Sequence, residues 1–303
     1  MTQNTQRETK LNLGILIGDA RSPGYDHPVD YSQSLDYDNL LNGDQAVDPL
    51  HSIDSQEWWK GRVPDAKVAD GGDYREFAEA ALAAAAEILE LKTNYEIVFV
   101  DSLPETTGLG LNIFNMETMK DSVILINQSI LDNAKGAAAG TGAKIGTIAM
   151  IAFHEARHIK QSETICQYLR IQYAARSIGY TYQAVKKEIE RSCGVKIEED
   201  QRRIKKWIAE QTNYESGCSP NYLAQDVEID ARAFENVLFK EMMGIEHVLS
   251  PTEKRRFEEM TRRYGEKAKK SMADLRQLSI EVFTKIEQKK AEETAEAERK
   301  KNC

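Results

Sequence analysis

Apolar residues form short strand-like runs between residues 95 and 127 and recur at helical spacing on either side of that stretch. Residues 74–92 are rich in Ala, Leu and Glu, which have high helix propensity, and predict a helix. Three runs rich in β-branched and aromatic residues follow, and they predict strands. These runs are residues 95–100, 111–114 and 122–127. Their close spacing predicts a small sheet with antiparallel or mixed pairing.

Almost everything beyond residue 143 is predicted to be helical. A Gly/Ala-rich loop leads into a helix over 144–161, in which Ile145, Ile148 and Ile151 recur at helical spacing. Further helices are expected over 163–178, 181–192, 197–212 and 224–243. A small sheet combined with a mainly helical C-terminal half indicates the α+β fold class.

The segment from residue 251 to residue 303 is expected to be a charged helical tail. Its apolar residues fall at three- and four-residue steps, which is the pattern of a coiled-coil-like helix. They are Met272, Leu275, Val282 and Ile286, and Ser279 lies on the same face. This stripe permits association with a second copy or with a partner. The last thirteen residues have no apolar face, and we expect them to fray into solvent.

Residues 1–70 have few periodic apolar positions and are rich in Asp and turn-forming residues. We interpret them as an acidic, extended arm ahead of a folded domain at 71–250. Leu11–Ile17 is a possible strand, and Trp58–Trp59 is a possible anchor to the core. His27 and His51 lie among Asp and Pro and are interpreted as loop histidines, with metal binding as the alternative. The arm's charge suggests the hypothesis that it covers a cleft as an inhibitory segment.

Composition excludes several classes of protein. The formal net charge of −9 disfavours the binding of nucleic acid through a basic surface, and no apolar run is long enough for a membrane span. The N-terminus lacks the pattern of a secretory signal. The four cysteines contain no CxxC pair, which argues against a disulfide framework or a cysteine zinc cluster. We therefore expect unpaired thiols in a reducing cytoplasm.

The informative segment reads Ile151-Ala-Phe-His-Glu-Ala-Arg-His-Ile159. His154 and His158, four residues apart on a helix, project from one face and can bind one zinc ion. Glu155 is placed to take a proton from a zinc-bound water, which is the HExxH arrangement of zinc hydrolases. Two histidines and a glutamate on an apolar helix are costly unless something compensates for their burial.

A catalytic zinc ion requires a third protein ligand and an open coordination position for water or substrate. His247 lies 89 residues after His158 (247 − 158 = 89) in a Gly/Glu stretch, so a carboxylate is the stronger candidate. The segment Tyr222–Phe234 contains three candidate carboxylates. Small residues in the same segment let its helix approach another backbone closely. The three carboxylates are Asp226, Glu228 and Asp230.

HExxH followed by Glu-x-x-Ala-x-Ala-Phe resembles the gluzincin metallopeptidases. The resemblance covers about residues 95–243 and implies a zincin-like fold in which Glu228 is the third zinc ligand, with Asp230 or Asp226 as alternatives. It also implies that the short strand pair ending in Ile124–Asn127, just before the motif helix, is the edge along which substrate lies. The helix spacing resembles that of membrane-integral CAAX-processing and heat-shock proteases, but the chain is more similar to small soluble zincin-like proteins of phages and mobile elements. Many gluzincins carry Asp four residues after the ligand Glu, and this chain carries Arg232 there.

Asp230 or Asp226 is then expected to accept the second N–H of a zinc-binding histidine. Arg157 and Arg232 are expected to form salt bridges with these carboxylates. Donors for the oxyanion of the transition state are sought among the tyrosines. The candidates are Tyr180, Tyr182, Tyr214 and Tyr222.

The sequence therefore predicts zinc-dependent hydrolysis of a peptide or protein substrate, with Glu155 as general base and His154, His158 and Glu228 as zinc ligands. Two alternatives remain open. One is a zinc-stabilised module without catalysis, and the other is a metal-free helical interaction protein with a fortuitous motif.

Overall fold

The computed structural model describes residues 58–103, 110–115, 121–129, 140–193, 199–214, 219, 221–245 and 249–301. The chain divides into two compact units. We call residues 56–163 and 217–303 the sheet unit, and the described residues 164–214 of the other unit the helical unit. The possible strand Leu11–Ile17 and three of the five histidines lie outside the described residues. These histidines are His27, His51 and His247.

The sheet unit contains a four-stranded sheet in the order β1-β2-β4-β3. Its strands are β1 (Val68–Ala69), β2 (Asn94–Val100), β3 (Gly110–Phe114) and β4 (Asp121–Asn127). The central strands β2 and β4 pair in parallel, whereas β1 and β3 pair antiparallel to them. The sheet is therefore mixed, and the purely antiparallel alternative is wrong. The two most apolar strands lie at the centre because only there can both of their faces be buried.

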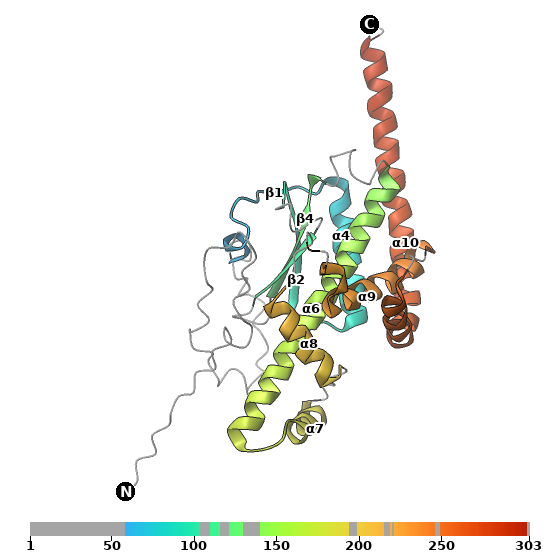
Figure 1. The fold of residues 1–303 in the computed structure, drawn as a ribbon. Coiled ribbons are helices and arrows are strands. Elements are labelled where there is room, and N and C mark those ends of the chain that lie inside the picture. The colour runs from blue at the N-terminus through green and yellow to red at the C-terminus, as the bar shows by residue number, and fades with distance from the viewer. Residues whose placement is uncertain are drawn as a thin grey trace. The chain divides into compact units, whose positions relative to one another are not determined.

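Alternate residues of the central strands serve two separate cores. Phe99 and Ile124 face a large core shared with helices α4 (Arg75–Leu89), α6 (Thr141–Ile178), α9 (Asp226–Met243) and α10 (Pro251–Lys301). Val98 and Leu125 face a smaller core, in which Trp59 of the 3₁₀ helix η1 (Trp59–Gly61) is fully buried. Because successive side chains of a strand point to opposite faces, one face of the sheet packs against the helices and the other against η1 (Figure 1).

Trp59 and β1 extend the folded region into residues that the sequence assigns to the arm. Trp59 anchors its segment to the core as predicted. Val68–Ala69 adds a short antiparallel strand at one edge of the sheet. The sheet unit therefore begins before residue 71.

The motif helix α6 is longer than predicted, because 144–161 and 163–178 form one continuous helix of 38 residues. Its first part, up to Glu163, belongs to the sheet unit. The remainder joins α7 (Tyr182–Cys193) and α8 (Gln201–Thr212) in the helical unit. The side chain of Asp200 caps α8 by accepting a hydrogen bond from the Arg202 N–H at 2.8 Å.

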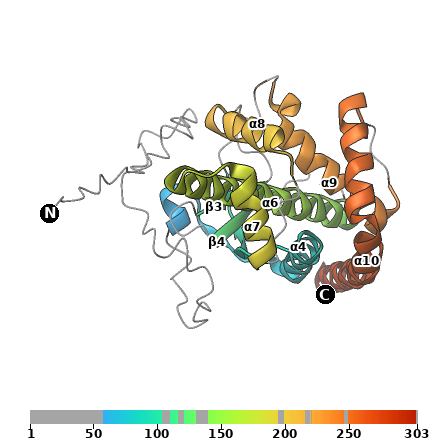
Figure 2. The same ribbon diagram turned by 90° about the horizontal axis from the view of Figure 1, so that it is seen from below.

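The C-terminal helix α10 packs against α9 and α4 (Figure 2). Its predicted stripe is buried, and four of the five stripe residues belong to the large core of the sheet unit. These four are Met272, Leu275, Val282 and Ile286. The prediction that the final segment frays is wrong, because the helix continues to Lys301 with exposed residues throughout its last eleven positions. None of the described helices, including the 51-residue α10, is both long and apolar enough to cross a membrane.

Candidate metal centre

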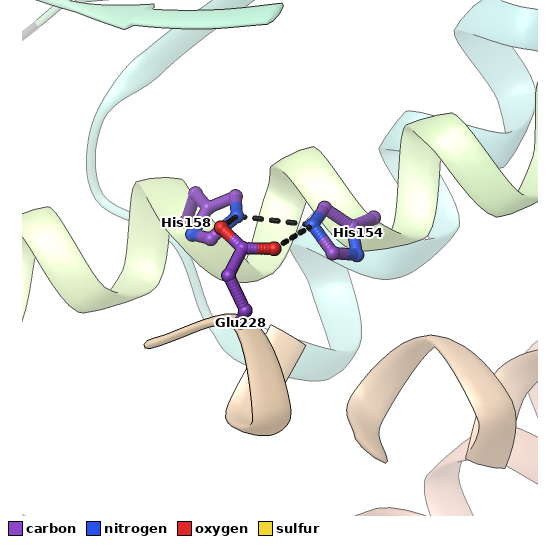
Figure 3. A group of neighbouring side chains, drawn as sticks. All are labelled: His154, His158 and Glu228. Atoms are coloured by element: carbon purple, nitrogen blue, oxygen red, sulfur yellow. Dashed lines mark hydrogen bonds and ion pairs between the residues drawn. The ribbon is translucent and has the colours of Figure 1, made fainter. Parts of the chain in front are cut away.

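His154 and His158 lie one turn apart on α6, and the packing of that helix directs both side chains toward α9. Ile148, Ala152 and Ile159 are fully buried in the large core. The two imidazoles occupy the side of α6 that faces the beginning of α9 (Figure 3). Their side chains are only 14% and 16% exposed, respectively.

Glu228 reaches both histidines from the first turn of α9. Its side chain is fully buried, with Oε2 3.3 Å from Nε2 of His154 and Oε1 3.4 Å from Nε2 of His158. The two Nε2 atoms lie 3.1 Å apart (Figure 3). The predicted trio therefore meets at one point, and neither Asp226 nor Asp230 belongs to this group.

The opposite ring nitrogens determine which tautomers the histidines adopt. Nδ1 of His154 lies 3.0 Å from Oε2 of Glu235, and Nδ1 of His158 lies 2.8 Å from Oε1 of Gln161. The amide orientation of Gln161 is fixed because its Nε2 donates to the Val227 carbonyl and to Asp230. Both Nδ1 atoms face acceptors and therefore carry the hydrogen, which leaves a lone pair on each Nε2 of the neutral rings.

These donor atoms match the requirements of a tetrahedral cation. Once both rings are deprotonated, two imidazole lone pairs and a carboxylate converge on one point, which suits a bound cation. Zinc bonds of about 2.0–2.1 Å place tetrahedral ligand atoms about 3.3–3.4 Å apart. The two Nε2 atoms lie 3.1 Å apart and each lies 3.3–3.4 Å from one of the two Glu228 oxygens, and one ligand atom from each residue falls within 4.8 Å of the others. The residues present therefore fit a zinc ion.

Charge coupling within the trio is strong. Burial raises the pKa of Glu228, but the charges and hydrogen bonds of His158 and His154 outweigh it and hold the pKa far below its usual range. Burial lowers the pKa of His154, yet Glu228 and Glu235 bring it well above its ordinary value. The pKa of His158 is also raised, because the charge of Glu228 outweighs burial. The charges within the trio therefore favour the protonated histidines, and because a metal ion binds the unprotonated rings, we expect binding to weaken as the pH falls.

Glu155 lies beside the trio and next to the edge strand β3. Its carboxylate approaches Gly110, where a Cβ atom would lie 3.6 Å from Oε1 of Glu155 and would overlap Cγ2 of Ile151. Burial raises the pKa of Glu155, opposed by the charges of His158 and His154 and by a hydrogen bond from the backbone of Asn112. A buried carboxyl group whose pKa is raised is suited to accept and return a proton.

Asp230 does not contact a histidine, contrary to the prediction that it orients one. It is 1% exposed and accepts hydrogen bonds from Nε of Arg157 at 2.7 Å and Nε of Arg256 at 2.6 Å. The predicted pairing of Arg157 with a nearby carboxylate is confirmed. Arg232 instead pairs with Glu253 of α10 at 2.9 Å.

The two residues that contact the Nδ1 atoms were not predicted from the sequence, although each lies at helical spacing from a predicted metal ligand. Gln161 follows His158 by three residues, which places it on the same face of α6. Glu235 follows Glu228 by seven residues, or about two helical turns. Of the tyrosines considered as oxyanion donors, Tyr180, Tyr182 and Tyr214 belong to the helical unit, whereas Tyr222 begins the 3₁₀ helix η4 (Tyr222–Ala224). That role stays a prediction for all four.

Comparison of the chain with protein-family models, with curated proteins and with solved structures finds no match.

Proposed function

We propose that the chain is a zinc-dependent peptidase whose metal ligands are His154, His158 and Glu228. The observation that carries the proposal is the convergence of two imidazole Nε2 atoms and one carboxylate, 3.1–3.4 Å apart, beside a buried glutamate. A purely structural metal site has no need for Glu155, whereas hydrolysis requires a base next to the metal.

In this proposal each residue has a separate task. Zinc, when bound, supplies Lewis acidity, which lowers the pKa of a water molecule and polarises the scissile carbonyl. Glu155 takes the proton from the attacking water and passes it to the leaving amine. The resemblance assigns the substrate to the strand pair that ends in Ile124–Asn127. Of that pair β4 is central and β3 is the edge strand, and the backbone of β3 contacts Glu155, so β3 is the expected place for an extended substrate.

The test combines metal analysis with peptide hydrolysis. Protein purified without added metal is expected to hold about one zinc ion per chain, and His154→Ala is expected to lose it. Glu155→Gln is expected to retain zinc but to lose about 10²–10⁴-fold in the rate of cleavage of a mixed peptide library. Glu87→Gln, on the exposed face of α4, is the matched control and should cleave as the natural chain does. Absence of zinc after reconstitution would contradict the proposal.

The burial of the site favours a second candidate, a zinc-stabilised module without catalysis. Glu228 is fully buried, so a metal ion would join α6 and α9 within the sheet unit. This candidate predicts that Glu155→Gln keeps every measurable property of the chain and that no peptide is cleaved. The first candidate predicts cleavage that is lost in that variant, so the same experiment separates the two.

A further inference from the structure

We propose that Gln161 is a positioning residue of the metal centre and that Arg256 of α10 controls metal affinity through it. The inference rests on the proposed metal site. It is carried by an unbroken series of buried hydrogen bonds that runs from α10 through α9 to the imidazole of His158. All of these residues belong to the sheet unit.

The first step of the series fixes His158. Gln161 is fully buried, and its Oε1 accepts a hydrogen bond from Nδ1 of His158 at 2.8 Å. This bond holds the hydrogen on Nδ1 and leaves Nε2 free to bind a metal. It also sets the rotation of the ring, because the oxygen lies in a fixed position one turn along the same helix.

The second step fixes the amide of Gln161. Its Nε2 donates to Oδ2 of Asp230 at 2.8 Å and to the Val227 carbonyl at 2.9 Å. If these acceptors were lost, rotation of the amide by 180° would present the NH₂ group to His158. The imidazole would then carry its hydrogen on Nε2, the form that cannot bind a metal there. Asp230 thus selects the tautomer of a histidine that it does not contact.

The third step anchors Asp230. Arg157 and Arg256 donate to its two carboxylate oxygens from opposite helices, with Nε–oxygen distances of 2.7 and 2.6 Å. Arg256 lies in the second turn of α10 and is 6% exposed. Because a thermodynamic coupling is reciprocal, metal binding should strengthen the attachment of α10 as much as Arg256 strengthens metal binding. The helix that the sequence presents as a tail is then part of the metal centre.

The test measures zinc dissociation constants by competition with a chromophoric chelator, together with the visible spectrum of the cobalt-substituted chain. Gln161→Met and Arg256→Met are expected to bind zinc about 10–100-fold more weakly than the natural chain. Arg256→Lys, which keeps the charge near Asp230, should recover part of the affinity. Arg255→Met is the matched control, because Arg255 is the exposed neighbour on the same helix and should change nothing.

Cobalt spectra separate positioning from general loss of structure. We expect Gln161→Met to bind cobalt with an altered ligand-field band, because the imidazole of His158 changes its orientation. If Arg256→Met fails to fold, Arg256→Lys and Gln161→Met decide the question. Affinity and spectrum unchanged in Gln161→Met would overturn this inference and leave the proposed function intact. A natural chain that binds no zinc would overturn both.

Discussion

Glu228 and Glu235 lie two turns apart on α9 and contact opposite nitrogens of one imidazole, that of His154. Oε2 of Glu228 lies 3.3 Å from Nε2, and Oε2 of Glu235 lies 3.0 Å from Nδ1. A single helix therefore supplies the proposed third ligand and also the acceptor that orients a ligand on another helix. The ring of His154 is held from both sides before any metal binds.

Replacing Glu235 should weaken metal binding without removing a ligand. In Glu235→Met the hydrogen on Nδ1 of His154 loses its carboxylate acceptor, so the tautomer and orientation of the ring are no longer fixed. We expect zinc affinity to fall by about 10–100-fold, measured by chelator competition. Glu241→Met, on the same helix, provides the control. Equal affinities for the two variants would show that Glu235 does not orient the ligand.

Asp230 should matter more for stability than any exposed ion pair. Asp230→Asn leaves the buried guanidinium groups of Arg157 and Arg256 without their shared negative charge. We expect a loss of about 3–5 kcal/mol in the free energy of unfolding, measured by urea denaturation of the metal-free chain. Lys269→Met, which breaks an exposed pair with Glu266, should have no measurable effect. A small loss for Asp230→Asn would mean that the two guanidinium groups find other partners.

The sequence predicts those features of the site that arise within a single helix. The four-residue spacing of His154 and His158 places them on one face of any helix, and their convergence follows from local geometry alone. Which carboxylate of α9 meets them depends on the rotation of α9 against α6, and the choice of Glu228 came from resemblance. Glu235 could not be assigned because the same rotation, set by packing of the whole core, decides what the second ring nitrogen meets.

Strand order and the partner of an apolar stripe are equally non-local. β2 and β4 pair in parallel at the centre of the sheet. A run of apolar residues predicts a buried strand, but it does not specify which strand lies beside it or in which direction that strand runs. The stripe of α10 has the same pattern whether it packs on a second chain or on its own core. In the structure it packs on its own core, against α4 and α9.

Because the stripe is buried in the chain's own core, its side chains should contribute to the free energy of unfolding. Leu275→Ala removes a side chain that is 4% exposed in the large core, and we expect a loss of about 2–5 kcal/mol in the free energy of unfolding. Ile280→Ala, at a position that is 53% exposed on the same helix, should cost much less. Both losses can be measured by urea denaturation. A change of oligomeric state in Leu275→Ala, seen by sedimentation velocity, would contradict the intramolecular role.

Gly110 should determine how closely β3 approaches the motif helix. In Gly110→Ala the added methyl group would overlap Cγ2 of Ile151 and lie close to the Glu155 carboxylate. We expect a loss of about 1–3 kcal/mol in the free energy of unfolding, since overpacking must displace the strand or the side chain. Gly61→Ala is the matched control, because a Cβ there meets nothing within 4 Å.

The Gly110 variant also separates binding from catalysis within the proposed function. The metal ligands come from α6 and α9, so zinc affinity should stay unchanged when β3 moves. Peptide cleavage should fall, because the backbone that contacts Glu155 is displaced from it. Ile151→Ala added to Gly110→Ala removes the overlapping methyl group and should restore part of the cleavage rate. Equal loss of zinc and of cleavage in Gly110→Ala would instead place β3 among the elements that hold the metal ligands.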